Sequence, residues 1–340
     1  MRKLYYISTP SPGLFFNTVN AYQRSAAIKA AVELNLFTAI SQGIESSQSL
    51  AQKCQTSERG MRILCDYLVI IGFMTKEAEG YRLTSDSAMF LDRQSKFYMG
   101  DAIEFLLSPM ITNGFNDLTA AVLKGGTAVS SQGTLSPEHP VWVQFAKAMS
   151  PMMANPAQLI AQLVNENKIE PLKVLDISAS HGLFGIAIAQ HNPNAEIFGV
   201  DWASVLEVAK ENARIKGVGS RYHTIVGSAF EVDYSNDYDL VLLPNFLHHF
   251  DVATCERLLR KIKASLVVDG RVLVFEFIPN SDRITPPDAA AFSLVMLATT
   301  PSGDAYTFAE YESMFSNAGF SHCQLHSLSP TEQQVIVAYR

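Results

Sequence analysis

Apolar residues recur in the second half of the chain as five short runs, each separated from the next by polar or helix-forming segments. The runs predict buried strands, whereas the stretches that begin at Leu183, Ala203, Ala253 and Phe308 have helical spacing. Such alternation is typical of a mostly parallel sheet covered by helices on both faces. The predicted strands are 173–177, 196–200, 222–226, 240–243 and 271–275.

The two apolar runs nearest the C-terminus predict a different connection. Residues 322–328 and 334–339 read as strands separated only by a turn that contains Pro330. A turn this short cannot hold a crossover helix, so the two strands are expected to pair as an antiparallel hairpin at the sheet edge. The fold class is therefore α/β, a Rossmann-like sheet that ends in an antiparallel hairpin.

The first hundred residues are mostly helical and then briefly β. The pattern predicts helices at 21–40, 49–54 and 57–72 and a hairpin within 74–84, which is a winged-helix outline. Ser57 is a credible N-cap for the third helix. That helix is apolar on too many sides to read bases in a DNA groove, so we expect it to pack against a second subunit in a homodimer.

A helical connector is expected between these two regions. The predicted domains are a winged-helix-like dimerisation domain at 1–96, the connector at 97–165 and the Rossmann-like catalytic domain at 166–340. The connector contains Trp142, Phe145, Met149 and Met153, a soft apolar surface able to mould around a flat ligand. Core packing explains such a stripe equally well.

Composition narrows the possible partners and the compartment. The 340 residues carry a formal net charge of −7 and no basic run, which disfavours a nucleic-acid partner. The four cysteines lack the spacing of a disulfide framework or zinc site, so no metal and a reducing cytoplasm are expected. The N-terminus lacks the apolar core of a signal peptide, and the apolar run 289–298 is too short to span a bilayer, so no membrane partner is expected.

Residues 173–189 form the most informative motif. A strand that ends near Asp176 leads into a turn of small residues, and an amphipathic helix follows with its N-terminus at the same place. Small residues let backbone amides approach a ligand, and a nucleoside-type cofactor is the natural occupant. Asp201 ends the next strand, 25 residues further on, at the spacing where a carboxylate can bind ribose hydroxyls. An ordinary strand-to-helix turn is the alternative. The turn residues are Ser178, Ala179, Ser180 and Gly182.

Two further strand ends carry residues suited to proton transfer. His248 and His249 follow the strand 240–243, and Glu276 follows the strand 271–275. A histidine and a carboxylate from neighbouring strand ends can form a general base and the group that orients it. A helix-capping histidine and a solvated carboxylate are the alternatives, and the residues alone do not decide between His248 and His249.

The chain resembles the S-adenosylmethionine-dependent O-methyltransferases that act on small, often aromatic hydroxyl compounds. The likeness covers nearly the whole chain. It is carried by VLDISASHG, GVDWASV, VGSAFE, LLPNFLHHFD, and GRVLVFEFIPN followed by YTFAEYESMFSNAGF. Aligned to the family's histidine motif, the general base falls on His248, with His249 as its neighbour and Glu276 as the orienting group.

The resemblance also implies which residues hold S-adenosylmethionine. It places the turn from Ser178 to Gly182, after Asp176, around the methionine part, and Asp201 on the ribose with Trp202 beside it. Ser228 and Ala229 would lie near the adenine. The sequence departs from the family pattern in three ways. Ser178, Ala179 and Ser180 replace glycines in the turn, Ser228 replaces an acid, and Pro244 replaces a lysine.

The leading hypothesis is methyl transfer from S-adenosylmethionine to a hydroxyl of a small, aromatic or largely apolar acceptor. Phe145, Met149, Met153, Phe292, Met296 and His249 are expected to line the acceptor site. Three alternatives stay open at this point. They are a C-methyltransferase or non-methylating member of the same fold, an NAD(P)-dependent oxidoreductase, and a winged-helix regulator that senses a ligand.

Overall fold

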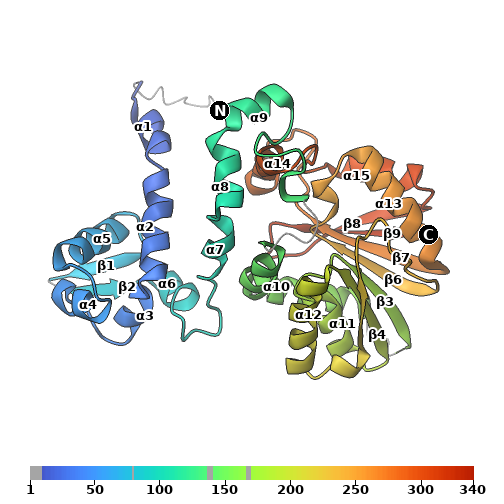
Figure 1. Cartoon of the computed structure of the whole chain (residues 1–340), viewed down its shortest axis with the longest axis horizontal. Helices are drawn as coiled ribbons and strands as arrows, with labels where there is room; N and C mark the ends of the chain where they lie inside the picture. Colours follow the sequence, from blue (N-terminus) through green and yellow to red (C-terminus); the bar gives the residue numbers. More distant parts are fainter. Residues whose placement is uncertain (1–9, 79, 136–140, 166–169) are drawn as a thin grey trace, which may run out of the picture. The chain divides into compact units, whose positions relative to one another are not determined.

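A computed structural model describes residues 10–78, 80–135, 141–165 and 170–340. The chain forms two compact units, Met1–Ile103 and Glu104–Arg340. Figure 1 shows the helices and strands of each unit along the chain. Each unit has its own buried core.

The first unit is a small helical domain with a two-stranded hairpin. Its core is formed mainly by α2 to α5 and the hairpin, and includes Leu36, Phe37, Leu68 and Tyr81. Its elements are α1 (Gly13–Val19), α2 (Tyr22–Glu33), α3 (Leu36–Ser41), α4 (Ser47–Lys53), α5 (Glu58–Ile70), β1 (Met74–Glu77), β2 (Gly80–Leu83) and α6 (Ser85–Phe90).

Two local predictions in this unit have clear outcomes. Ser57 is the N-cap of α5, where its side chain accepts a hydrogen bond from the Gly60 amide. The single helix predicted at 21–40 is wrong, because Asn35 adopts a left-handed conformation (φ 57°) and separates α2 from α3. Apolar spacing continues across Asn35, so the hydrophobic pattern alone did not reveal the break.

The second unit is built on a seven-stranded sheet in the order β5-β4-β3-β6-β7-β9-β8. The strands β3 to β7 are parallel to one another, and β9 pairs antiparallel with β7 and β8, so the predicted edge hairpin is confirmed. The strands are β3 (Leu172–Ile177), β4 (Ala195–Asp201), β5 (Tyr222–Val226), β6 (Tyr238–Pro244), β7 (Leu266–Glu276), β8 (His322–Ser327) and β9 (Gln334–Tyr339).

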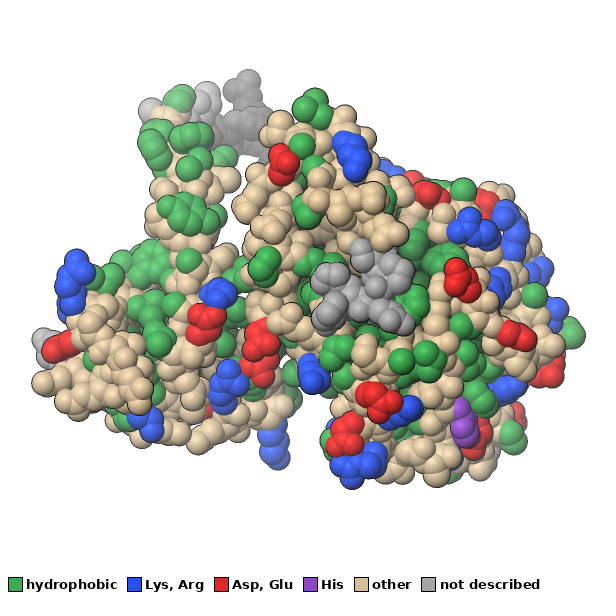
Figure 2. Space-filling model, in the orientation of Figure 1, with side chains coloured by type: hydrophobic (Ala, Val, Ile, Leu, Met, Phe, Trp, Pro, Cys, Tyr) green, Lys and Arg blue, Asp and Glu red, His purple; other side chains and the backbone are tan. Residues whose placement is uncertain are grey.

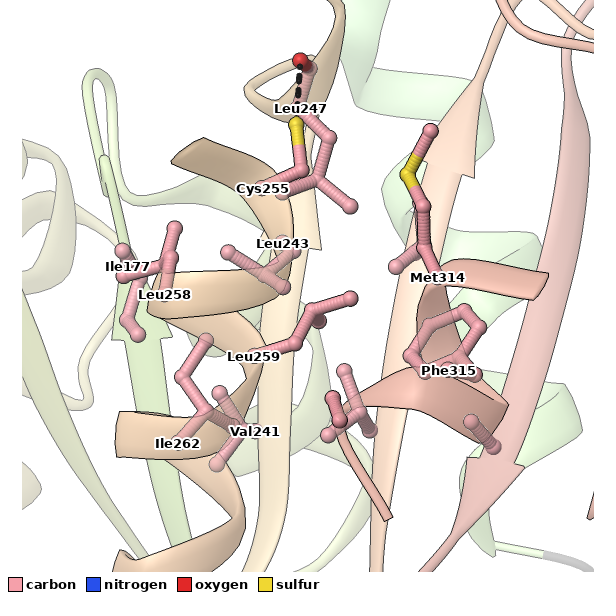
Figure 3. Packing of buried hydrophobic residues seen from close by; sticks show 14 of the residues in the cluster. Ile177, Val241, Leu243, Leu247, Cys255, Leu258, Leu259, Ile262, Met314 and Phe315 are labelled. Atoms are coloured by element: carbon pink, nitrogen blue, oxygen red, sulfur yellow. Dashed lines mark hydrogen bonds between the residues drawn. The ribbon is translucent and has the colours of Figure 1, made fainter. Parts of the chain in front are cut away.

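Helices cover both faces of this sheet (Figure 1). On one face α13 and α15 pack against β6 and β7, as Figure 3 shows for Leu258 and Leu259 of α13 beside Leu243 of β6. On the other face lie α10, α11 and α12. The bounds of these helices are α10 (Val141–Asn165), α11 (Leu183–His191), α12 (Ala203–Ile215), α13 (Val252–Ser265) and α15 (Phe308–Asn317).

The remaining helices of the second unit meet at the end of α14 (Pro287–Thr299). Gly114, Gly126 and Gly133 approach the backbone there so closely that an added Cβ would lie 2.0 to 2.5 Å from a carbonyl oxygen of residues 298–301. Glycine is therefore required for this packing. These segments are α8 (Pro109–Asn116), α9 (Leu118–Lys124) and the 3-10 turn η1 (Gly133–Leu135). The helix α7 (Ala102–Leu106) crosses the boundary between the units in sequence.

Candidate active site

The sheet topology predicts a ligand site at the carboxyl ends of β3 and β6. From β3 the chain proceeds outward to β4 and β5, and it then returns to the other side of β3 to form β6 and β7. Ligands of open α/β sheets bind where the strand order reverses in this way. The predicted cofactor turn follows β3 and the predicted base follows β6, so the topology puts both at this reversal.

The turn after β3 adopts a left-handed backbone conformation at three residues, although only one of them is glycine. Ser178 (φ 56°), Ser180 (φ 51°) and Gly182 (φ 74°) are all left-handed. Each serine in this conformation costs about 1 to 2 kcal/mol relative to an ordinary one. At Gly182 a Cβ would lie 2.9 Å from both Ala209 and the Tyr222 hydroxyl, so no larger residue fits there. The turn is thus a close-packed cradle despite its serines.

Asp201, at the end of β4, is bound to this turn. Its Oδ2 accepts a hydrogen bond from the Ser180 amide at 2.9 Å, and its Oδ1 accepts one from the Trp202 amide at 2.7 Å. Burial raises the pKa of Asp201 to about 6, although both hydrogen bonds favour the ionised form. The carboxylate predicted to bind ribose therefore lies beside the cradle.

Asp176 lies beneath the same turn and is fully buried. Its Oδ2 accepts a hydrogen bond from the Gly185 amide of α11 at 3.2 Å, and its Oδ1 has no partner among the residues that the structure describes. Burial, and to a smaller extent the nearby Asp201, raise the pKa of Asp176 to about 8, although the hydrogen bond from Gly185 lowers it. Tyr222, whose buried hydroxyl also lacks a partner, borders the turn as well. Sequence analysis missed the contact of Tyr222 with this turn.

The predicted adenine-binding residues follow β5. The loop begins with Gly227, whose amide donates to the Asp201 carbonyl oxygen at 3.0 Å. Ser228 Oγ accepts a hydrogen bond from the Phe230 amide at 3.3 Å, and Ala229 is buried. This hydrogen bond holds the loop against the end of β4, beside Asp201.

The predicted base and its orienting carboxylate are in direct contact. His248 Nδ1 and Glu276 Oε2 are 2.5 Å apart, and both side chains are almost completely buried. The other carboxylate oxygen, Oε1, accepts hydrogen bonds from the amides of Phe246 (2.9 Å), Leu247 (2.9 Å) and His248 (3.4 Å). Glu276 therefore holds both the imidazole and the backbone that carries it.

Several segments fix the turn that carries His248, which ends in η3 (Leu247–His249). Asn245 starts the turn in a left-handed conformation (φ 54°), and its side-chain oxygen accepts a hydrogen bond from Gln333. The Cys255 thiol of α13 donates to the Leu247 carbonyl oxygen at 3.3 Å (Figure 3). A Cβ on Gly303 would lie 2.2 Å from the His248 carbonyl oxygen. Sequence analysis missed Asn245, Gln333 and Gly303.

Five of the six predicted acceptor-lining residues come from α10 and α14, and the sixth, His249, lies in η3 beside His248. The Phe292 ring meets the His248 ring edge-on, with centroids 4.9 Å apart, and stacks on Phe277. Met296 is buried one helical turn further along α14. On α10, Phe145 contacts Trp142 and Phe105, Met149 is partly buried, and Met153 packs beside the base turn, with its sulfur 3.9 Å from Asn245 Nδ2. Phe292 and His249 are thus the residues in this set whose rings contact the base.

Comparison with known proteins decides the family. An O-methyltransferase domain matches residues 116–321, and an O-methyltransferase dimerisation domain matches residues 16–93. The chain belongs to the O-methyltransferase family. The prediction of an enzyme of this family, with S-adenosylmethionine as its methyl donor, is confirmed, and so is the fold class.

Three relatives of the O-methyltransferase illustrate the match. A protein of Nostoc punctiforme, whose crystal structure is described as that of a candidate O-methyltransferase, is 92% identical, with a TM-score of 0.95 over 98% of this chain and 100% of that one. The 3-hydroxy-5-methyl-1-naphthoate 3-O-methyltransferase of Streptomyces sahachiroi is 24% identical over 91% of this chain and 90% of its own. Human N-acetylserotonin methyltransferase, solved with S-adenosylmethionine, is 21% identical, with a TM-score of 0.85 over 99% of both chains.

Two other structural findings concern metal and membrane. Among the described residues, no group of three or more histidine, cysteine or acidic side chains is placed to hold a metal ion. None of the helices in the described part of the O-methyltransferase has the length and hydrophobicity needed to cross a bilayer.

Proposed function

We propose that the enzyme methylates a hydroxyl group of a small, aromatic or largely apolar acceptor, with His248 as the general base. The buried contact between His248 and Glu276 carries this proposal. A carboxylate at Nδ1 places the proton of the neutral ring on that nitrogen, so Nε2 is left with a free lone pair. Nε2 is then the atom that accepts the hydroxyl proton.

Glu276 has two functions in this scheme. As a carboxylate it stabilises the imidazolium that forms when His248 takes the proton. Its three amide contacts keep the base turn in one conformation before any ligand binds, which lowers the reorganisation needed at the moment of reaction. S-adenosylmethionine supplies an electrophilic methyl group on a sulfonium, so the protein residues need only orient the acceptor and remove its proton.

The cofactor is proposed to occupy the cradle after β3. The backbone from Ser178 through Ala179 and Ser180 to Gly182 would surround its methionine part, and Asp201, with Trp202 beside it, would bind the ribose hydroxyls. The close packing around Gly182 supports this fit, because it holds the turn tightly against Ala209 and Tyr222 and so in one backbone conformation. Ser228 and Ala229 would lie at the adenine. Asp176 would act from below, by ordering the turn through Gly185.

The acceptor is proposed to lie between His248 and the apolar residues of α10 and α14. Aromatic and thioether side chains favour a flat, largely apolar molecule. The contact of Phe292 with the base ring supports this arrangement most directly. The proposed lining residues are Phe145, Met149, Met153, Phe292 and Met296.

A homodimer formed through the N-terminal domain is proposed as the working state. The dimerisation domain match supports it. Helix α1 supports it as well, because Leu14 and Phe15 are 81% and 64% exposed and neighbouring apolar side chains extend this surface (Figure 2).

The proposed compartment is the cytoplasm. The four cysteines are free thiols, which suits a reducing compartment of this kind.

The test is a methyl-transfer assay with labelled S-adenosylmethionine and a panel of hydroxyaromatic compounds. The wild-type enzyme is expected to form methyl ethers, and His248→Ala is expected to lower turnover about 10²- to 10⁴-fold. Affinity for S-adenosylhomocysteine, measured by calorimetry, should stay within about twofold. Product structure by NMR separates O-methylation from C-methylation. Unchanged turnover in His248→Ala, or methyl attached to carbon, would contradict the proposal.

A further inference from the structure

A second imidazole lies beside the base. The ring centroids of His248 and His249 are 4.3 Å apart, with an angle of 54° between the ring planes. His249 is held from the other side by Trp142 of α10, whose ring meets it edge-on at 5.8 Å and 82°. The position of His249 is therefore fixed by aromatic packing, whereas that of His248 is fixed by a carboxylate.

The two histidines differ in their hydrogen bonding. His248 is bound to Glu276, but within the described residues neither ring nitrogen of His249 has a partner. His249 Nδ1 is shut off from solvent. His249 Nε2 is not fully buried in this way, so Nε2 is the ring nitrogen that a ligand can reach.

The surroundings of His249 decide its charge and tautomer. Burial, and then the neighbouring His248, lower the pKa of His249 well below its ordinary value, so the ring is neutral and carries one N–H. A buried acceptor without a partner is tolerated more often than a buried N–H without one. The proton is therefore favoured on Nε2. The site then presents an acceptor on His248 beside a donor on His249.

Given the proposed methyl transfer with His248 as base, we propose that His249 determines acceptor specificity. Its Nε2–H donates a hydrogen bond to a carbonyl oxygen placed next to the hydroxyl that is methylated. The acceptor class is thus an aromatic hydroxyl with an adjacent carbonyl group. In such a compound the hydroxyl proton is held by an internal hydrogen bond to the carbonyl. A donor that binds the carbonyl oxygen releases this proton for transfer to His248.

The test compares matched acceptors that differ only at the carbonyl. The probes are ortho-hydroxyacetophenone and ortho-ethylphenol, together with their naphthalene counterparts, and the readout is the ratio of kcat/KM within each pair. The wild-type enzyme is expected to prefer the carbonyl member about 10- to 100-fold, the range expected when loss of a partner leaves a polar group unpaired. His249→Phe should bring the ratio close to one.

Two further variants separate hydrogen bonding from packing. The amide of His249→Gln reaches about the position of Nε2 and should restore part of the preference, whereas that of His249→Asn reaches only the position of Nδ1 and should not. A wild-type ratio near one, or a preference that survives in His249→Phe, overturns the proposal. The proposal is also overturned if the carbonyl compounds neither react nor bind to the complex of the enzyme with S-adenosylhomocysteine. If other hydroxyl compounds are still methylated through His248, only the role of His249 is lost and the proposed function stands.

Discussion

The two turns that form the site differ in how completely the protein satisfies the buried carboxylate at each of them, Glu276 at the base turn and Asp176 at the cofactor turn. At the base turn, both oxygens of Glu276 are occupied, by the His248 ring and by three backbone amides. At the cofactor turn, Asp176 Oδ1, Ser180 Oγ and the Tyr222 hydroxyl are buried and find no partner in the described part of the chain. The protein alone therefore prepares the base, whereas the cofactor turn retains buried polar groups that lower its stability and make it sensitive to pH.

The largest effect is expected when the charge of Glu276 is removed and the shape of its side chain is kept. Glu276→Gln keeps an oxygen for the three amides, but its NH₂ group would face His248 Nδ1 and favour the wrong tautomer. Turnover is expected to fall about 10³- to 10⁴-fold, as when an orienting carboxylate is replaced by an amide in other enzymes. The free energy of unfolding should change by only about 1 kcal/mol.

Glu276→Ala is the matched control for that experiment. It leaves the amides and the imidazole without a partner and should cost about 3 kcal/mol or more of stability in urea unfolding. If Glu276→Gln retains turnover, or if both variants are equally unstable, Glu276 does not orient the base in the way described.

The next largest effect is expected at Gly303. In Gly303→Ala the new Cβ would lie 2.2 Å from the His248 carbonyl oxygen, so the base turn must shift. A displacement of about 1 Å lowers catalysis about 10²-fold. Gly219→Ala is the control, because neither Gly219 nor Gly303 is left-handed and a Cβ on Gly219 would make only ordinary contacts, the nearest at 3.4 Å from Arg214 Cα. Equal activity of the two variants would show that Gly303 does not support the base.

The contacts that hold the base turn show which features the sequence could predict and which it could not. The strands were predicted closely, because short apolar runs mark buried strands whatever their neighbours. His248 and Glu276 were singled out because both follow strand ends, but their contact joins side chains 28 positions apart in the sequence. Gly303 against His248 and Gln333 on Asn245 depend on how distant segments pack. No local pattern carries that information.

The cofactor turn should respond more mildly than the base turn. Asp201→Asn removes the charge that would strengthen hydrogen bonds from ribose hydroxyls, so the Kd for S-adenosylhomocysteine should rise about 10-fold. In the wild-type protein the pKa of Asp201 is raised to about 6, so binding should weaken as the pH falls through 6 and the carboxylate is protonated. Calorimetry at several pH values measures both effects. A flat profile in the wild type would argue against a contact with Asp201.

The last prediction concerns the stability of the cofactor turn. Because burial raises the pKa of Asp176 to about 8 from 3.8, the folded state holds a proton that the unfolded state has lost between these values. Stability is therefore greatest below the unfolded pKa and falls as the pH rises toward 8, by at most about 1.4 kcal/mol per pH unit. Asp176→Asn should remove this slope. Parallel unfolding curves for the two proteins between pH 5 and about 8 would contradict the assignment.

The central claim is that Glu276 holds the proton of the neutral His248 ring on Nδ1 and leaves Nε2 free as the base. Nitrogen NMR of the histidine-labelled enzyme measures this directly, and His248→Asn identifies the signals. We expect a protonated Nδ1 and a bare Nε2 in the wild-type protein, and the reverse in Glu276→Gln. A wild-type ring with its proton on Nε2, or a tautomer that Glu276→Gln leaves unchanged, would contradict the claim.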